Sequence, residues 1–458
     1  MNIKKVILGC LLLALSLEGW SETVIRYRVY LKDKAKTTFT LENPASYLSD
    51  RSLQRRAKQS LPITYSDLPV SQAYVNTLQK QGVRIVTQSK WNNTVVVETT
   101  DTVHMQQTLE QLPFVNKVKK VWTKPDFVPE RNKNRKKEVT NHFTKTDNPY
   151  GKAYPQIAMH HGDSLHAAGF RGKGMHIAVI DAGYYNADVI KLFKKVDVLG
   201  MHNFVHDEAD LFEEQSHGMK VLSCMAVNRP QVMVGTAPEA SYWLLRSEDD
   251  DTEQPIEEDY WAAAIEFADS AGVDVVNTSL GYYAFDDSLS NYRYRDLDGH
   301  TSLMSNSASM AADKGMLVVC SAGNSGMSSW KKVTPPGDAE NVLTVGAISK
   351  KRVNADFSSV GNTTDGRIKP DVMAVGFESV VVDTNGAIGL ANGTSFSSPT
   401  FCGLVACLWQ ACPWLTAKEM IELIRRSADR FDYPDNIFGY GIPDVWKAYQ
   451  DANEKKHK

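Results

Sequence analysis

The sequence is poor in cysteine, in net charge and in long apolar runs, and each shortage excludes a class of protein. Only six of its 458 residues are cysteines. The five beyond residue 21 all lie in apolar runs: Cys224, Cys320, Cys402, Cys407 and Cys412. Their odd number does not suit a disulfide framework, so we expect them to pack as small apolar side chains. The formal net charge of −3 gives no electrostatic reason to expect a nucleic-acid partner.

The most apolar segment stands at the N-terminus, and no later run is long enough to predict a membrane span. Residues 1–21 begin with MNIKK, continue with VILGCLLLALSL and end in EGWS. A basic start, an apolar stretch and small residues before a cut are typical of a signal peptide. Cys10 offers lipidation as an alternative, but cleavage there would leave a very short apolar region. We therefore predict a protein exported to the periplasm or outside the cell.

Residues 22–125 carry strand and helix patterns in the order β-α-β-β-α-β. Strands are predicted over 24–31, 83–91, 94–100 and 115–122, and helices over 71–82 and 104–112. This order is typical of a ferredoxin-like α+β domain. A further basic helix is predicted as an insertion at 47–59.

The rest of the chain divides into a linker, a large domain and a tail. Residues 126–149 are polar and basic without apolar periodicity, which predicts a linker open to proteolysis. Nucleic-acid binding by its basic run is the less favoured alternative. From 150 to 450, short apolar strands alternate with helices, and strands without polar alternation are buried on both faces. We expect a parallel α/β sheet there, followed by a polar tail at 451–458.

Four polar side chains stand where elements of the large domain end or begin: Asp181, His217, Asn324 and Ser395. Ser395 precedes an apolar run that predicts a buried helix, so it would lie near the positive end of the helix dipole. Pro399 has no N–H, which deprives the Ser395 carbonyl of its helical donor. Singly, such residues usually cap helices or form turns. Together at the ends of elements in one parallel sheet, they indicate a reactive site.

The segments around these residues resemble the motifs of subtilisin-like serine proteases. HIAVIDAG, SHGMKVLSCMA, SAGNSG and NGTSFSSP occur in the order that the family uses. GTAPEA, VDVVNTSLG and DGRIKPDVMAVG are also similar, so the resemblance covers roughly residues 150–450, and residues 23–123 are similar in pattern to the family's inhibitory pro-domains. The resemblance implies an α/β fold, a subtilisin-like three-layer sandwich with a mostly parallel sheet, preceded by a small ferredoxin-like α+β pro-domain.

The resemblance also implies a role for each of the four residues. Ser395 would attack a peptide carbonyl, His217 would take and return the proton, and Asp181 would orient the imidazole. Asn324 and the backbone N–H of Ser395 would bind the oxyanion. Ser397 and Ser398 would then be packing or cap residues.

Substrate would bind along exposed strand edges. The residues implied by the resemblance are Ser279, Leu280 and Gly281 on one side of the first pocket and Ser321, Ala322 and Gly323 on the other. Met219, Lys220, Phe396 and Ser397 depart from the family's motifs without removing a reactive group. The departures therefore affect the expected specificity and leave the expected chemistry in place.

The acidic loop at 247–259 matches the rim of the family's distal subsites and has three interpretations: a solvated loop, a preference for basic substrates, or calcium binding. No cofactor or metal site is assigned. We predict an exported serine endopeptidase that acts on proteins or peptides and is made as a zymogen, with its own pro-domain as intramolecular inhibitor. The alternatives are a catalytically dead peptide-binding module and a peptide ligase or maturation protease on the same fold.

Overall fold

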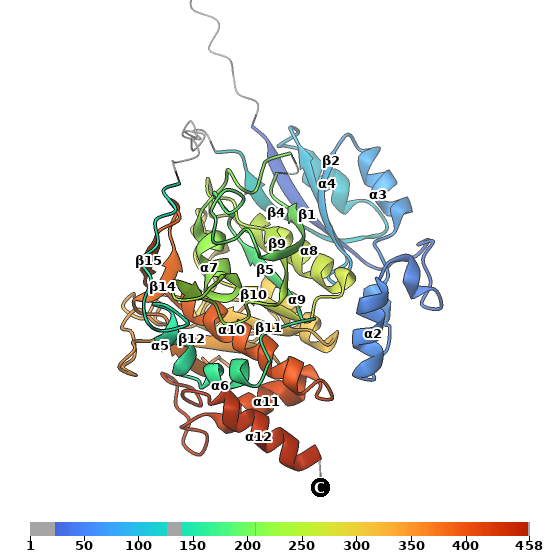
Figure 1. Ribbon diagram of the computed structural model, residues 1–458. Helices are drawn as coiled ribbons and strands as arrows, with labels where there is room; N and C mark the ends of the chain where they lie inside the picture. The colour runs from blue at the N-terminus through green and yellow to red at the C-terminus, as the bar shows by residue number, and fades with distance from the viewer. Residues whose placement is uncertain (1–22, 126–138, 207, 457–458) are drawn as a thin grey trace, which may run out of the picture.

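The computed structural model describes residues 23–125, 139–206 and 208–456, shown as coloured ribbon in Figure 1. The predicted signal peptide at 1–21, with Cys10, and residues 126–138 of the predicted linker lie outside the described residues. In the figure the N-terminal domain is blue, and the larger domain runs from green to red.

The N-terminal domain has the predicted β-α-β-β-α-β order. Its strands are β1 (Ile25–Leu31), β2 (Arg84–Ser89), β3 (Thr94–Thr99) and β4 (Val115–Thr123), and its helices include α3 (Gln72–Gln79) and α4 (Met105–Glu110). The sheet is antiparallel in the order β2-β3-β1-β4. Alternate side chains of β1 and β3 pack with α3 and α4 into a core of this domain's own residues. The predicted basic helix is α2 (Asp50–Lys58), which leads on to the short 3₁₀ helix η2 (Tyr65–Asp67).

The large domain is built on a seven-stranded sheet in the order β13-β12-β11-β10-β5-β9-β6. The strands are β5 (His176–Asp181), β6 (Asp197–Asn203), β9 (Ser241–Arg246), β10 (Val275–Thr278), β11 (Leu317–Ser321), β12 (Leu343–Ile348) and β13 (Val372–Val375). Every neighbouring pair is parallel. The carboxyl ends of the strands therefore lie at one edge of the sheet, where reactive groups of open α/β folds collect.

Helices cover both faces of this sheet, which makes three layers (Figure 1). Ile177 and Val179 of β5 pack with α7 (His217–Ala226) and α10 (Thr394–Ala411). Ala178 and Ile180 point to the other side, against α8 (Ile256–Ala271) and α9 (Leu303–Asp313). Burial on both faces explains why the strands are apolar without alternation, and the predicted architecture is confirmed.

Smaller elements complete the chain. They are α5 (Tyr154–Ala158), α6 (Gly162–Ala167), α11 (Ala417–Ser427), α12 (Val445–Lys456), the 3₁₀ helices η1 (Pro44–Ser46), η3 (Ser288–Ser290) and η4 (Tyr294–Asp296), and the paired strands β7 (Asn228–Arg229) with β8 (Met233–Val234) and β14 (Ser379–Val382) with β15 (Ile388–Ala391).

The N-terminal domain docks on α8 with the second face of its sheet. Val96 and Val121 of the sheet pack against Ile256 and Tyr260 of α8. Beside them Arg28, which is 2% exposed, donates to Asp259 from Nε to Oδ1 at 2.7 Å and from Nη2 to Oδ2 at 2.6 Å. The charged face of β1 can be buried because Asp259 of α8 compensates the charge of Arg28.

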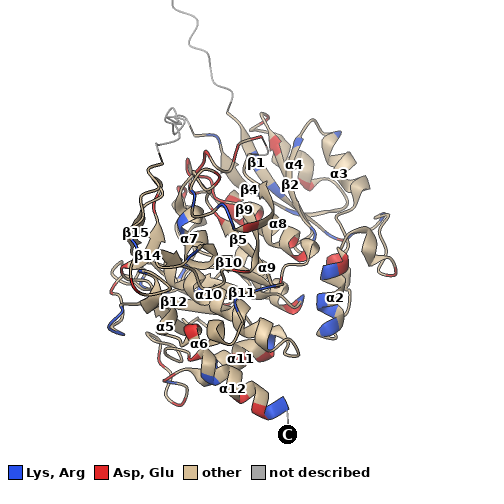
Figure 2. Ribbon diagram, viewed as in Figure 1, with Lys and Arg blue, Asp and Glu red and all other residues tan. Residues whose placement is uncertain are grey.

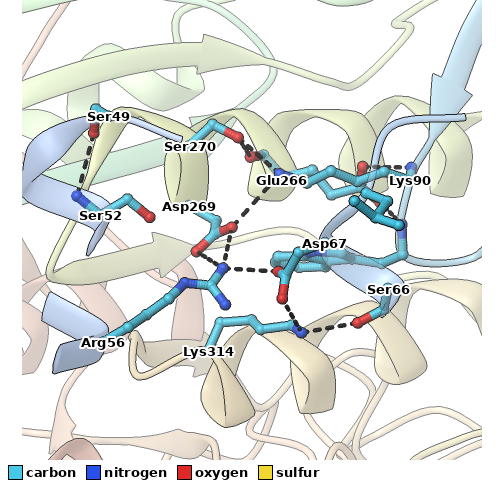
Figure 3. A network of polar contacts seen from close by, with 12 residues as sticks. Ser49, Ser52, Arg56, Ser66, Asp67, Lys90, Glu266, Asp269, Ser270 and Lys314 are labelled. Atoms are coloured by element: carbon cyan, nitrogen blue, oxygen red, sulfur yellow. Dashed lines mark hydrogen bonds and ion pairs between the residues drawn. The ribbon is translucent and has the colours of Figure 1, made fainter. Parts of the chain in front are cut away.

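A second group of ion pairs ties α2 and the segment after it to the large domain (Figure 3). Figure 2 shows the basic residues gathered on α2. Arg56 donates to both carboxylate oxygens of Asp269 on α8, at 2.9 and 2.7 Å, and lies 2.9 Å from Asp67 of its own domain. Asp67 in turn pairs at 3.0 Å with Lys314, which follows α9. All of these side chains are buried, so the contact is a fixed interface.

The structure also bears on the predictions for the cysteines, the linker, the C-terminal tail and membrane-spanning helices. The five cysteines beyond residue 21 are free and buried, as predicted. Of the predicted linker, the described part lies along the large domain: Thr140 N–H donates to the Asn385 carbonyl, and Val139 packs against the core. Residues 451–456, expected as a polar tail, instead continue α12, because Ala448 and Ala452 give that helix a buried face. Across the described ranges no helix combines the length and apolarity that a membrane crossing needs.

Candidate active site

Asp181 ends the central strand β5 and is fully buried. Its Oδ1 accepts the Ala182 N–H at 2.8 Å and the Nδ1–H of His217 at 2.7 Å. Gly218 allows this approach, because a Cβ there would stand 2.8 Å from the Asp181 Cβ and 2.6 Å from the Gly183 carbonyl oxygen. A buried carboxylate is costly unless it is paired, and His217 is the partner of Asp181.

His217 is the first residue of α7, and its side chain is about a third exposed (31%). Burial opposes protonation of this imidazole, but the charge of Asp181 and the hydrogen bond to it outweigh burial, so the pKa of His217 is raised. The ring lies 5.8 Å from that of Phe396, the residue after Ser395. The predicted histidine and serine motifs are thus neighbours in space.

Ser395 is the second residue of α10, at the N-terminal end of the helix. Its hydroxyl donates to the Ser279 carbonyl at 3.4 Å, and the Ser279 hydroxyl donates to the Ser395 carbonyl at 3.0 Å. The second bond replaces the helical donor that Pro399 lacks. Among the hydrogen bonds of the described chain none joins Ser395 to His217.

The side chains of Ser397 and Ser398, the serines that follow in α10, both donate hydrogen bonds within the large domain. Ser397 donates to the Thr394 carbonyl at 3.0 Å, and Ser398 donates to Oδ1 of Asn277 at 2.9 Å. Both are fully buried, whereas Ser395 is 7% exposed and lines the pocket. Their contacts agree with the packing roles predicted for Ser397 and Ser398.

Asn324 stands just beyond the end of β11, with its amide orientation set by Thr394. Its Oδ1 accepts both the N–H of Thr394 at 2.9 Å and its hydroxyl at 3.0 Å. Since the oxygen is the atom that accepts, Nδ2 is the remaining donor of the side chain. Asn324 and Ser395 line the same pocket, so an amide donor and the first turn of α10 meet there.

The pocket has a volume of about 390 Å³ and brings together most of the predicted residues. Those that line it are His217, Ser279, Leu280, Gly281, Ser321, Gly323, Asn324 and Ser395. Asp181 lies behind His217. Ala322 does not line the pocket: its N–H donates to the Val345 carbonyl at 3.0 Å, and its carbonyl accepts from Thr334 at 3.2 Å. Ala322 therefore supports the pocket wall through its backbone hydrogen bonds.

Sequence reasoning did not assign several other lining residues, which include Gln215, Glu248, Asp250, Glu253, Tyr282 and Tyr283. The three acids come from the loop between β9 and α8, within the acidic stretch noted above. The sequence showed that this loop is rich in acids, but it did not show which of them face the pocket. In the described ranges no three His, Cys, Asp or Glu side chains are grouped as a metal site.

Comparisons with known proteins identify the family of the chain. The model of the subtilase family matches residues 172–441, and the peptidase S8 propeptide domain of Bacteroidota matches residues 26–138. The chain is 30% identical over 279 residues to the thermophilic serine proteinase of Bacillus sp. strain AK1, covering 60% of this chain and 61% of that protein. It is 29% identical over 297 residues to Subtilisin NAT of Bacillus subtilis subsp. natto, covering 64% of this chain and 68% of that protein.

The fold is also similar to the solved structure of the MycP3 protease from the type VII (ESX-3) secretion system. The TM-score is 0.52 at 21% identity, with 68% of this chain and 93% of that chain covered. That likeness concerns the fold alone. The family match spans more than half of the chain and contains all four motifs. This protein therefore belongs to the subtilase family and carries an N-terminal S8 propeptide domain.

Proposed function

We propose that the protein is a serine endopeptidase, exported as a zymogen, that hydrolyses peptide bonds through an acyl-enzyme on Ser395. The observation that carries this proposal is the 2.7 Å hydrogen bond from His217 to Asp181 in a pocket that also holds Ser395 and Asn324. The basic and apolar pattern of residues 1–21 supports export.

The first step is nucleophilic attack. The Ser395 hydroxyl leaves the Ser279 carbonyl and turns toward Nε2 of His217, which accepts its proton as Oγ bonds to the peptide carbonyl carbon. Asp181 keeps the other ring nitrogen protonated and stabilises the imidazolium. His217 then gives the proton to the leaving amine, and water cleaves the acyl-enzyme with the same base.

The negative charge that develops on the carbonyl oxygen has two donors available. Thr394 occupies Oδ1 of Asn324, so Nδ2 is free to donate, and the Ser395 N–H lies in the first turn of α10 without a helical partner. The helix dipole adds to this effect. Donors fixed in advance stabilise the transition state more than the substrate.

The propeptide domain acts as an intramolecular inhibitor in this proposal. Strand β4 ends at Thr123, whose N–H donates to Gln254 Oε1 at 2.8 Å and whose carbonyl accepts from Gln254 Nε2 at 3.0 Å. Gln254 follows Glu253 of the pocket wall, so the chain leaves the propeptide domain beside the pocket. Among the described residues none of the propeptide domain lines the pocket itself. We place the maturation cut within 126–149, most of which lies outside the described residues.

Substituting Ser395 tests the proposal, with Ser397→Ala as a matched control. Ser395→Ala should lose fluorophosphonate labelling and stay full length after signal removal, whereas Ser397→Ala should label and mature. Labelling or isolated self-processing of Ser395→Ala would contradict the assignment. A wild-type protein that does not label would indicate a binding module, and ligated products with an added amine acceptor would indicate a ligase.

A further inference from the structure

The pocket has an acidic wall that the catalytic mechanism does not use. Glu248, Asp250 and Glu253 line it from the loop between β9 and α8. No lysine or arginine stands among the lining residues that the structure describes. The side of the pocket formed by this loop therefore offers carboxyl groups to a bound peptide.

The loop that forms the acidic wall is held in place from behind. The fully buried Glu257, in the first turn of α8, accepts the Asp249 N–H at 2.8 Å and the Gln254 N–H at 3.2 Å. These two bonds bracket Asp250 and Glu253, and Asp249 directly follows Glu248. A wall fixed before binding loses little entropy when a ligand binds, which suits a recognition site better than a solvated loop does.

A buried hydroxyl at the same wall is also unsatisfied. Tyr282 lines the pocket, is 3% exposed, and its OH has no hydrogen-bond partner in the described chain. Burial and then the charges of Glu257, Glu248 and Glu253 raise the pKa of this phenol, which places the hydroxyl among the acids. A buried polar atom is costly while it is unpaired. A hydrogen-bond donor from substrate would satisfy it.

The carboxyl groups themselves favour a positive ligand. Burial, followed by the negative charges of Asp181, Glu253 and Asp250, raises the pKa of Glu248 to about 8, against the opposing effect of His217. Burial and then Asp286 raise the pKa of Glu253 to about 7. A cation between these groups would reverse both shifts, because it compensates the charge that burial penalises.

We propose that the acidic wall binds a lysine or arginine side chain of the substrate near the scissile bond, so that this subtilase selects basic peptides. The inference rests on the proposed function and names its substrate class. The chain's own sequence offers such a peptide: residues 131–137 read RNKNRKK, a few residues beyond Thr123, which is bonded to Gln254 next to the wall.

The test uses mature enzyme and fluorogenic peptides that differ at one position. Arginine, norleucine or glutamate is placed in turn at each of the four positions before the scissile bond, and kcat/KM is measured. We expect arginine to exceed norleucine by about tenfold or more at one position, and glutamate to be the poorest. The arginine-to-norleucine ratio should fall about tenfold in Glu248→Gln and in Glu253→Gln. Glu454→Gln, an exposed acid on α12, is the charge-matched control and should keep the ratio.

The pH dependence provides a second readout. Because the wall carboxyls ionise as the pH rises through about 7 to 8, the arginine-to-norleucine ratio should increase between pH 6 and pH 9 in the wild type. The increase should be smaller in Glu248→Gln. Arginine stays charged throughout this range, so the change reports on the enzyme.

The outcomes separate the inference from the function on which it rests. If the wild type labels with fluorophosphonate but shows no basic preference, or if both variants keep the full ratio, the acidic wall does not recognise substrate and the inference is wrong. If activity depends on calcium and the variants lose that dependence in place of selectivity, the wall binds a metal and the inference is also wrong. If the wild type does not label at all, the proposed function itself fails.

Discussion

Replacing Asp269 by asparagine tests how the propeptide domain is held on the enzyme. Asp269 belongs to α8 of the peptidase domain and is fully buried. It faces Arg56 of the propeptide domain (Figure 3) and also pairs with Arg55. Arg56 reaches both of its oxygens at 2.9 and 2.7 Å, and Arg55 donates to Oδ1. Lys90 lies 3.6 Å away. One carboxylate thus lies against three basic side chains of the propeptide domain.

The loss of binding free energy in Asp269→Asn depends on the contacts that Arg55 and Arg56 keep. Removing one member of a buried ion pair costs about 3–5 kcal/mol, because its partner stays buried without compensation. Arg56 would keep Asp67 at 2.9 Å, and Arg55 would keep the Val273 carbonyl at 2.5 Å. We therefore expect the lower end, about 3 kcal/mol, which corresponds to about a hundredfold weaker inhibition.

The assay measures the inhibition constant of separately produced propeptide domain, residues 22–125, against mature enzyme. This domain has a core of its own, so it can be added as a folded inhibitor. Asp313→Asn is the matched control on α9, where Asp313 and Lys418 pair at 2.9 Å but are 61% and 54% exposed. Exposed pairs contribute little, so its inhibition constant should stay near the wild-type value. The buried pair predicts an inhibition constant about a hundredfold higher in Asp269→Asn. An inhibition constant that changes by less than about threefold would refute the reasoning.

Two further predictions concern the catalytic groups. Asn324→Ala should lower kcat by about 10²–10³ with little change in KM, since its Nδ2 is expected to bind charge that exists only in the transition state; steady-state kinetics showing a pure KM effect would contradict this role. The acid limb of kcat/KM against pH should have its midpoint above 6.5, because His217 acts as a base only when neutral and Asp181 raises its pKa against the effect of burial. Asp181→Asn should move that midpoint to lower pH, and a wild-type midpoint at or below 6.5 would count against the pairing.

The position of the candidate site could be predicted because the order of strands and helices determines where the residues at their ends meet. Apolar strands without alternation predicted a parallel sheet buried on both faces. In such a sheet the residues after the strands share one edge, so Asp181 and Asn324 had to lie near each other. The proline at 399 further singled out Ser395, whose carbonyl indeed finds a donor outside the helix.

The propeptide interface could not be predicted in the same way. Because side chains alternate along a strand, Arg26 and Arg28 share one face of β1, and two arginines on one face are by themselves typical of a face exposed to solvent. Arg28 is instead buried, because the carboxylate of Asp259, more than two hundred residues later, compensates its charge. Local sequence contains no sign of a partner so distant. The acidic residues of α8 have the same ambiguity, since a helix rich in carboxylates looks solvent-exposed until its basic partner is known.

In the proposed mechanism, helix α8 and the loop before it connect inhibition to substrate recognition. Gln254 holds the end of β4, Glu257 holds the acidic loop, and the body of the helix binds the propeptide domain through buried carboxylates. When the propeptide domain leaves, Arg28, Arg55 and Arg56 leave with it, and Asp259 and Asp269 lose their counter-charges together. Like charges on one helix then repel one another and attract basic chains. The mature enzyme would thus present an acidic face next to an acidic pocket wall, and a basic peptide would be attracted to the first on its way to the second.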